Sequence, residues 1–457
     1  MEKQFFNDCF KGNVEEVKQL LDNKNNTDLN LNYQDKENNE ATSFYIACEK
    51  GHIEVVKLLL NDERIDVNKS KKDGATPFFI ACQEGRVEIV KLLIENEKVD
   101  IRKANKNEAT PLNISCGKNQ IEIVKLLLND GRIDINQGDK AGLTPFYIAC
   151  QNGHIELIKL LFNEEKVEIN KADKNGQTPF WIACQKGNIE IVKLLLNNEK
   201  ININQPSKDD QTPFWITCGK NHMEILKLLL NNEKIEVNQP DKDGVTSFHF
   251  VCEKGYIEIA KLLLNDKRVD INKVENKHGT TPFWIACDKG HIQIVEMLLN
   301  DNRNEINKGN KNEATPFWIA CGKNQIGIVK LLLQDKKVDI NKPRDNEVSP
   351  LLNACQNGHI EILKLLLNDE RIDVNKPNKY GQTLFFIACE NGDIEVVKLL
   401  LKYTKVDRDQ VAHDCRTPFY IACQKGYSEV VDLLRNESNL FLILSFSSLS
   451  FFPFLFS

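Results

Sequence analysis

Cysteine and histidine are the side chains of this 457-residue chain that could bind metals, form disulfides or act as nucleophiles. The chain has fourteen cysteines and eight histidines. Twelve cysteines recur every 34 residues, or 35 in one case: Cys48, Cys82, Cys116, Cys150, Cys184, Cys218, Cys252, Cys287, Cys321, Cys355, Cys389 and Cys423. Cys9 belongs to the same series, and Cys415 alone does not fit this spacing. The first residues lack the apolar run of a secretory signal peptide. We therefore expect reduced thiols and a cytoplasmic or nuclear protein.

The spacing argues against both disulfides and a metal site. Equivalent residues on stacked helices lie about 8–10 Å apart, whereas a disulfide needs Cα atoms within about 7 Å. No two cysteines have the spacing of a zinc knuckle. Five histidines share one repeat position, and neighbours in that series lie roughly 20–30 Å apart. They are His52, His154, His222, His291 and His359. We expect no metal and no cofactor, and we interpret the periodic cysteines as small buried side chains. Cys415 is the candidate reactive thiol, with sequence drift as the alternative.

Composition and motifs exclude several functional classes. The chain is 41% hydrophobic and 28% charged, and its net charge of −6 gives no basic excess for nucleic-acid binding. It contains no phosphate-binding loop, dinucleotide fingerprint, nucleophile elbow or His-Glu-x-x-His zinc motif. We therefore predict that the chain is not an enzyme and binds no nucleic acid.

The elements that position the cysteines repeat with them. In one unit, Thr178 and Pro179 predict the start of a short helix. Gly187 predicts that this helix ends at a residue in the left-handed backbone conformation. The second helix, 189–196, is apolar on nearly all sides, so we expect it to be sandwiched between neighbours. Residues 173–177 supply the turn between units. Such a period predicts an all-α solenoid rather than the roughly three globular domains that the length suggests.

This unit resembles the ankyrin repeat. Thr-Pro-Phe-x-Ile-Ala-Cys-x-x-Gly at 178–187 is similar to the family's Thr-Pro-Leu-His-Leu-Ala-Ala-x-x-Gly, and 189–196 matches its second helix. The resemblance covers twelve repeats over 38–435, after a partial amino-terminal repeat and linker at 1–37. The family's His occurs once, as His249, and Arg102 and Asp409 replace the family's hairpin Asn. The resemblance implies a monomeric, non-enzymatic scaffold or adaptor that binds one or more proteins.

Two sets of residues are candidates for partner binding. The residue before the buried Ile is aromatic in nine of twelve repeats, and its tryptophans are Trp181, Trp215, Trp284 and Trp318. These rings either anchor a partner or pack against the next repeat's turn in place of the family's His. The resemblance also implies binding through the variable turn tips, where the candidates are Lys72, Asp73, Asn107, Asp209, His278 and Tyr380.

Three features depart from the repeat. Asn353 replaces a buried Ile, where an unpaired amide would be costly. Residues 246–256 diverge most from the repeat pattern and precede a one-residue insertion near Lys277. This divergence indicates either a bend in the stack of repeats or sequence drift. Residues 436–457 form a tail whose last 18 residues, 440–457, carry no charge and barely suffice to span a bilayer. We interpret the tail as a membrane anchor, an artefact or truncation, or a segment that docks on the exposed face of the last repeat. The alternatives to a scaffold are therefore a membrane-tethered adaptor and a fragment of a larger ankyrin protein whose effector domain is missing.

Overall fold

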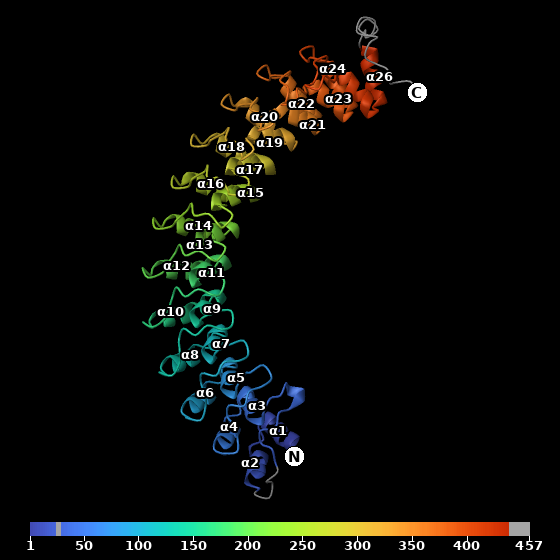
Figure 1. Cartoon of the computed structure of the whole chain (residues 1–457). Coiled ribbons are helices and arrows are strands. Elements are labelled where there is room, and N and C mark those ends of the chain that lie inside the picture. Colours follow the sequence, from blue (N-terminus) through green and yellow to red (C-terminus); the bar gives the residue numbers. More distant parts are fainter. Residues whose placement is uncertain (24–28, 438–457) are drawn as a thin grey trace. The chain divides into compact units, whose positions relative to one another are not determined.

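The structure is a computed structural model that describes residues 1–23 and 29–437 (Figure 1). Over these residues it contains 26 α-helices, one 3-10 helix at Lys36–Asn38 and no β-strand. The prediction of an all-α repeat fold is confirmed. The chain divides into two compact units, Met1–Glu236 and Val237–Ser457, and each is described by itself.

Each unit is built from consecutive pairs of short helices, most of which are labelled in Figure 1. The pairs of the first unit are α1 (Glu2–Lys11) and α2 (Val14–Asp22), α3 (Ser43–Lys50) and α4 (Ile53–Leu60), α5 (Pro77–Gln83) and α6 (Val87–Ile94), α7 (Pro111–Gly117) and α8 (Ile121–Leu128), α9 (Pro145–Asn152) and α10 (Ile155–Phe162), α11 (Pro179–Lys186) and α12 (Ile189–Leu196), and α13 (Pro213–Gly219) and α14 (Met223–Leu230).

The second unit continues the same alternation. Its pairs are α15 (Ser247–Lys254) and α16 (Ile257–Asn265), α17 (Pro282–Lys289) and α18 (Ile292–Leu299), α19 (Pro316–Gly322) and α20 (Ile326–Gln334), α21 (Pro350–Gln356) and α22 (Ile360–Leu367), α23 (Leu384–Asn391) and α24 (Ile394–Leu401), and α25 (Pro418–Lys425) and α26 (Ser428–Glu437). Within each unit, every odd-numbered helix packs against the next odd-numbered helix.

The odd-numbered helices begin and end by local rules. Thr178 Oγ1 accepts a hydrogen bond from the Trp181 N–H at 3.1 Å, and Pro179 is the first helical residue of α11. A Thr or Ser caps every odd-numbered helix from α3 to α25 in this way. Gly187 ends α11 in the left-handed conformation, with φ 77°. These caps hold the helices at seven to eight residues and turn the chain back for the second helix.

The even-numbered helices are less enclosed than the sequence predicts. In α12, Ile191, Val192 and Leu195 are buried, but Ile189 and Leu196 are only half-buried. The reason is that α12 packs on α11 and contacts α14 along one face. Its outer face carries the Lys193–Glu190 ion pair, with 2.8 Å between Nζ and Oε1. The prediction of a sandwiched second helix is therefore wrong for α12.

The periodic cysteines line the core of the odd-numbered helices. All fourteen cysteines lie in the described residues and none of them forms a disulfide, and the twelve from Cys9 to Cys389 are buried. Burial raises the pKa of Cys184 to about 12, which keeps its thiol protonated near neutral pH. Cys415 and Cys423 are exposed. The prediction that Cys423 is buried is wrong, because no helix pair within residues 29–437 follows α25 and α26 to cover it.

Thiol labelling should distinguish these two classes. We expect a maleimide to modify Cys415 and Cys423 rapidly in the native chain, while the twelve buried thiols react only as fast as the chain opens. The double variant Cys415→Ser/Cys423→Ser, counted by intact-mass spectrometry, should stay unmodified until denaturant is added. Rapid labelling of a third cysteine in the native chain would show that the core is not closed as described.

Candidate partner-binding surface

The turn tips form a continuous backbone edge within each unit. The Lys106 N–H donates to the Asp73 carbonyl at 2.9 Å, and the Lys140 N–H donates to the Asn107 carbonyl at 2.8 Å. In the second unit, the Lys311 N–H donates to the His278 carbonyl at 2.8 Å. Each tip is therefore held by the backbone of its neighbour, and its conformation is fixed before any partner binds.

The tips keep one shape with different side chains. Asp173 Oδ1 accepts hydrogen bonds from the N–H groups of Asn175 and Gln177 at 2.9 and 2.8 Å, which closes the turn. Gly176 follows with φ 76°, but Glu108, Asp210 and Glu313 adopt φ values of 58–61° at the equivalent position. Acidic side chains thus occupy positions where glycine is sterically preferred. The shared turn lets the side chains vary without moving the backbone.

All six predicted tip residues are exposed. They are Lys72, Asp73, Asn107, Asp209, His278 and Tyr380. Tyr380 is the most apolar of them, and 57% of its surface is accessible. The Lys379 Nζ lies 5.0 Å from the centre of its ring. The tips of the first unit therefore offer charged and amide groups along one edge, and those of the second unit include the His278 and Tyr380 rings.

The tryptophans lie deeper than the tips. Trp181 is 1% exposed and Trp215 is 7% exposed, whereas Trp284 and Trp318 are half-buried. The indole Nε1–H groups of Trp181, Trp284 and Trp318 each donate at 2.8 Å to a backbone carbonyl of the next turn. This geometry favours packing over partner binding, because the buried rings present little surface and the indole donor is used within the stack.

A row of asparagine amides fixes the repeats at their other edge. Asn136 Nδ2 donates to the Lys166 carbonyl at 2.7 Å, and Asn136 Oδ1 accepts from the Glu168 N–H at 2.8 Å. The same pair of bonds is made by Asn32, Asn68, Asn170, Asn204, Asn238, Asn272, Asn307, Asn341 and Asn375. Each amide links two successive repeats.

The turn histidines cap helices rather than merely following them. His222 Nε2 lies 3.1 Å from the Gln185 carbonyl at the end of α11. His52, His154, His291 and His359 make the equivalent contact at 2.9–3.3 Å. The sequence predicts these histidines at helix starts, but it does not reveal this hydrogen bond, because the carbonyl that each ring contacts lies in the preceding repeat. Over residues 1–23 and 29–437, no three His, Cys, Asp or Glu side chains gather in a way that could hold a metal ion.

The amide of Asn353 is satisfied. Its Nδ2 donates to the Trp318 carbonyl at 3.0 Å, and Asn357 Nδ2 donates to its Oδ1 at 3.2 Å. The neighbouring position is Gly322, and a Cβ there would collide with the Asn353 amide. The cost expected for an unpaired amide at this position is therefore avoided.

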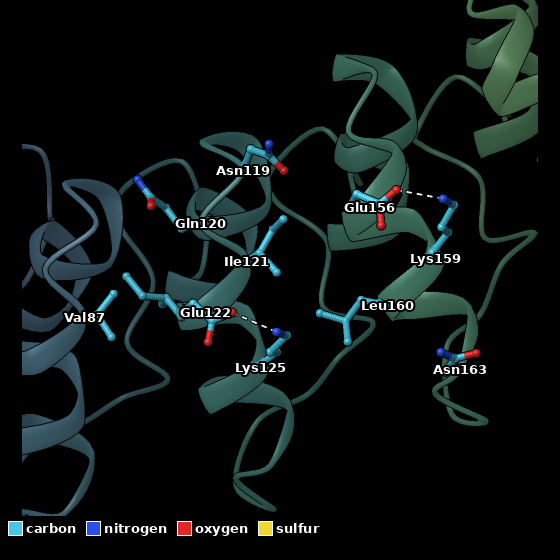
Figure 2. Close-up of a pocket in the computed structure, with 11 residues that line it drawn as sticks. Val87, Asn119, Gln120, Ile121, Glu122, Lys125, Glu156, Lys159, Leu160 and Asn163 are labelled. Carbon is cyan, nitrogen blue, oxygen red and sulfur yellow. Dashed lines mark hydrogen bonds and ion pairs between the residues drawn. The ribbon is translucent and has the colours of Figure 1, made fainter.

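An open groove of about 680 Å³ lies on the outer face of the first unit, along α8 and α10 (Figure 2). Its ionisable side chains are already paired along their own helices, Glu122 with Lys125 and Glu156 with Lys159, each at 2.7 Å. The same pair recurs on many even-numbered helices, for example between Glu190 and Lys193. The groove is a feature of the repeat, and its other polar side chains are the amides of Asn119, Gln120 and Asn163.

No helix within residues 1–23 and 29–437 is both long enough and apolar enough to cross a bilayer. The apolar tail, 440–457, lies outside the described residues, as does nearly all of the 436–457 segment. The interpretation of this tail as a membrane anchor or an artefact therefore stays a prediction.

Comparison with known families agrees with the repeat pattern. A family model described as ankyrin repeats (3 copies) matches the chain repeatedly, at residues 7–71, 63–139, 95–173, 127–207, 146–243, 201–275, 267–344, 283–378 and 351–442. No curated protein sequence matches it.

Proposed function

Because this chain belongs to the ankyrin repeat family, whose repeats generally serve protein–protein interaction, we propose that it is a non-enzymatic scaffold that binds protein partners through its turn tips. The observation that carries this proposal is the contrast between the fixed backbone of the tips and their varied, exposed side chains. A backbone that is already ordered spares a binding surface part of the entropy cost of association.

Away from the tips, polar side chains of the repeats are used in hydrogen bonds between neighbouring repeats. The tryptophan donors, the asparagine amides and the turn histidines are bonded to neighbouring repeats. We therefore assign the binding role to the tips and interpret the tryptophans as packing residues. In this proposal, 38–435 forms the twelve-repeat binding region and 1–37 a partial repeat with its linker.

The fourteen cysteines, all of which lie in the described residues, form no disulfide, which supports a reducing compartment such as the cytoplasm or nucleus. Reduced thiols in the core need no oxidant for folding, and the packing around them depends on their small volume. The scaffold acts as a monomer in this proposal, with one or more proteins as its partners.

Matched surface variants should test the role of the tips. The tip variant is Lys72→Ala/Asp73→Ala/Asn107→Ala, and the control on the outer face is Glu88→Ala/Lys91→Ala/Lys125→Ala. Both sets are exposed, and the outer ion pairs contribute little to stability. We expect both variants to melt within a few degrees of the parent chain. In quantitative affinity capture, only the tip variant should lose its partners, by about tenfold or more, which corresponds to roughly 1.4 kcal/mol. Equal capture by the two variants, or a loss confined to the outer variant, would refute the proposal.

A further inference from the structure

His249 is a titratable side chain at a position that elsewhere holds residues without charge at neutral pH. The equivalent residues in the second unit are Trp284, Trp318, Leu352, Phe386 and Tyr420. The His249 side chain lies on α15 and is only 4% exposed. It faces the turn that carries the extra residue, between α16 and α17.

The hydrogen bonds around His249 define which ring nitrogen carries the proton. Thr280 Oγ1 donates to the Glu275 carboxylate at 3.1 Å, so it accepts from His249 Nε2 at 3.2 Å. Glu275 also accepts hydrogen bonds from the N–H groups of Lys277, His278 and Thr280. His249 Nδ1 is therefore the unprotonated nitrogen, and it is buried with no hydrogen-bond partner.

A second proton on this ring has no acceptor in the folded chain. Protonation would create a buried N–H donor without a partner and a buried charge, both of which are unfavourable. Burial lowers the pKa of His249 below its ordinary value of 6.5, and the nearby Glu275 and Glu253 carboxylates only partly oppose this effect. Burial raises the pKa of Glu275, but its backbone N–H donors outweigh burial and leave that pKa lowered, so Glu275 stays ionised.

The other charged groups of the packed elements do not face the ring. On α16, Glu258 and Lys261 are exposed. On α17, Lys289 is exposed and pairs with Asp288 at 3.4 Å. The groups that interact with the neutral His249 ring therefore lie on α15 and in the turn between α16 and α17.

We propose that His249 makes the junction between α15 and the turn before α17 a pH-sensitive joint, which loosens when the medium becomes mildly acidic. The sign follows from proton binding. The unfolded or locally opened state binds the proton more tightly, so the joint has its full stability above about pH 6.5 and loses stability as pH falls through the folded-state value. The rings at the equivalent positions of α17 and α19 are tryptophans and do not titrate.

Hydrogen–deuterium exchange on the full chain tests this proposal. Between pH 7.5 and 5.5, after correction for intrinsic exchange rates, protection of amides in 247–289 should fall by at least about threefold relative to those in α19–α21. Asp266 and Asp301 should not contribute, because hydrogen bonds from Arg268 and Arg303 lower their pKa values below 3.8. The variant His249→Trp, which restores the residue of the neighbouring repeats, should lose this pH response. The variant His278→Asn at the exposed tip should keep it.

A proton NMR titration of the histidine rings gives an independent measurement if His249→Trp fails to fold. The ring signal that disappears in His249→Phe should titrate below the ordinary histidine pKa of 6.5. A pKa of 6.5 or above for that ring, or unchanged protection between pH 7.5 and 5.5, would overturn the proposal. Retention of the pH response in His249→Trp would also overturn it.

Discussion

Trp181→Ala should lower the free energy of unfolding of the first unit by about 3–5 kcal/mol, the range for removing a large aromatic ring from a core. The ring is 1% exposed, and its Nε1–H donates to the Gln211 carbonyl at 2.8 Å. The substitution leaves a cavity and removes one of the two hydrogen bonds that the Gln211 carbonyl accepts, the other being donated by the Ser207 N–H at 3.0 Å. Urea denaturation followed by circular dichroism measures the change.

Trp318→Ala is the matched control. Its indole makes the same 2.8 Å bond to the next turn, but the ring is half-buried and Arg344 lies 5.2 Å from its centre. We expect a smaller loss, because less apolar area leaves the core. If Trp181→Ala preserved stability and abolished partner capture, Trp181 would be a binding anchor rather than a packing residue.

Gly187→Ala should destabilise the first unit by about 2–3 kcal/mol, of which about 1–2 kcal/mol is the cost of a left-handed Ala. Gly187 has φ 77°, and a Cβ on it would lie 2.8 Å from the His222 ring. That ring caps α11 through the Gln185 carbonyl at 3.1 Å. Moving the ring would remove a further contribution of about 1 kcal/mol.

Gly153→Ala separates the two effects. Gly153 has φ 85°, so the backbone cost is similar, but the nearest atom of Asn188 lies 3.8 Å from the added Cβ. We expect it to lose only the backbone part, about 1–2 kcal/mol in the same urea assay. Equal losses for the two substitutions would mean that the His222 contact contributes nothing measurable.

Local structure could be predicted from the sequence because its causes lie within a few residues. Thr178 caps its helix through the N–H three residues later, and Gly187 adopts the left-handed conformation that a helix end requires. The exposure of the turn tips at Asn107 and Tyr380 follows from turn chemistry in the same way. These rules repeat with the period, so one unit defines the others.

Contacts between repeats could not be predicted, because they join residues 30–38 positions apart. The asparagine bond from Asn136 to the Lys166 carbonyl and the His222 cap both depend on how successive repeats stack. The exposure of Cys423 depends on what packs beyond α25, and the satisfaction of Asn353 depends on a glycine in the repeat before it. None of these neighbours is encoded within the 34-residue unit itself.

Site-specific photocrosslinking tests most directly whether the tips are the partner-binding surface. A photoreactive amino acid would replace Asn107 or Tyr380 at the tips, or Lys125 on the outer face of α8, one position at a time in the full chain. We predict that both tip positions capture proteins in cell extract and that the Lys125 position captures none above background. Adducts from Lys125 with equal yield, or no adducts from either tip while the chain still retains its partners, would contradict the assignment of binding to the tips.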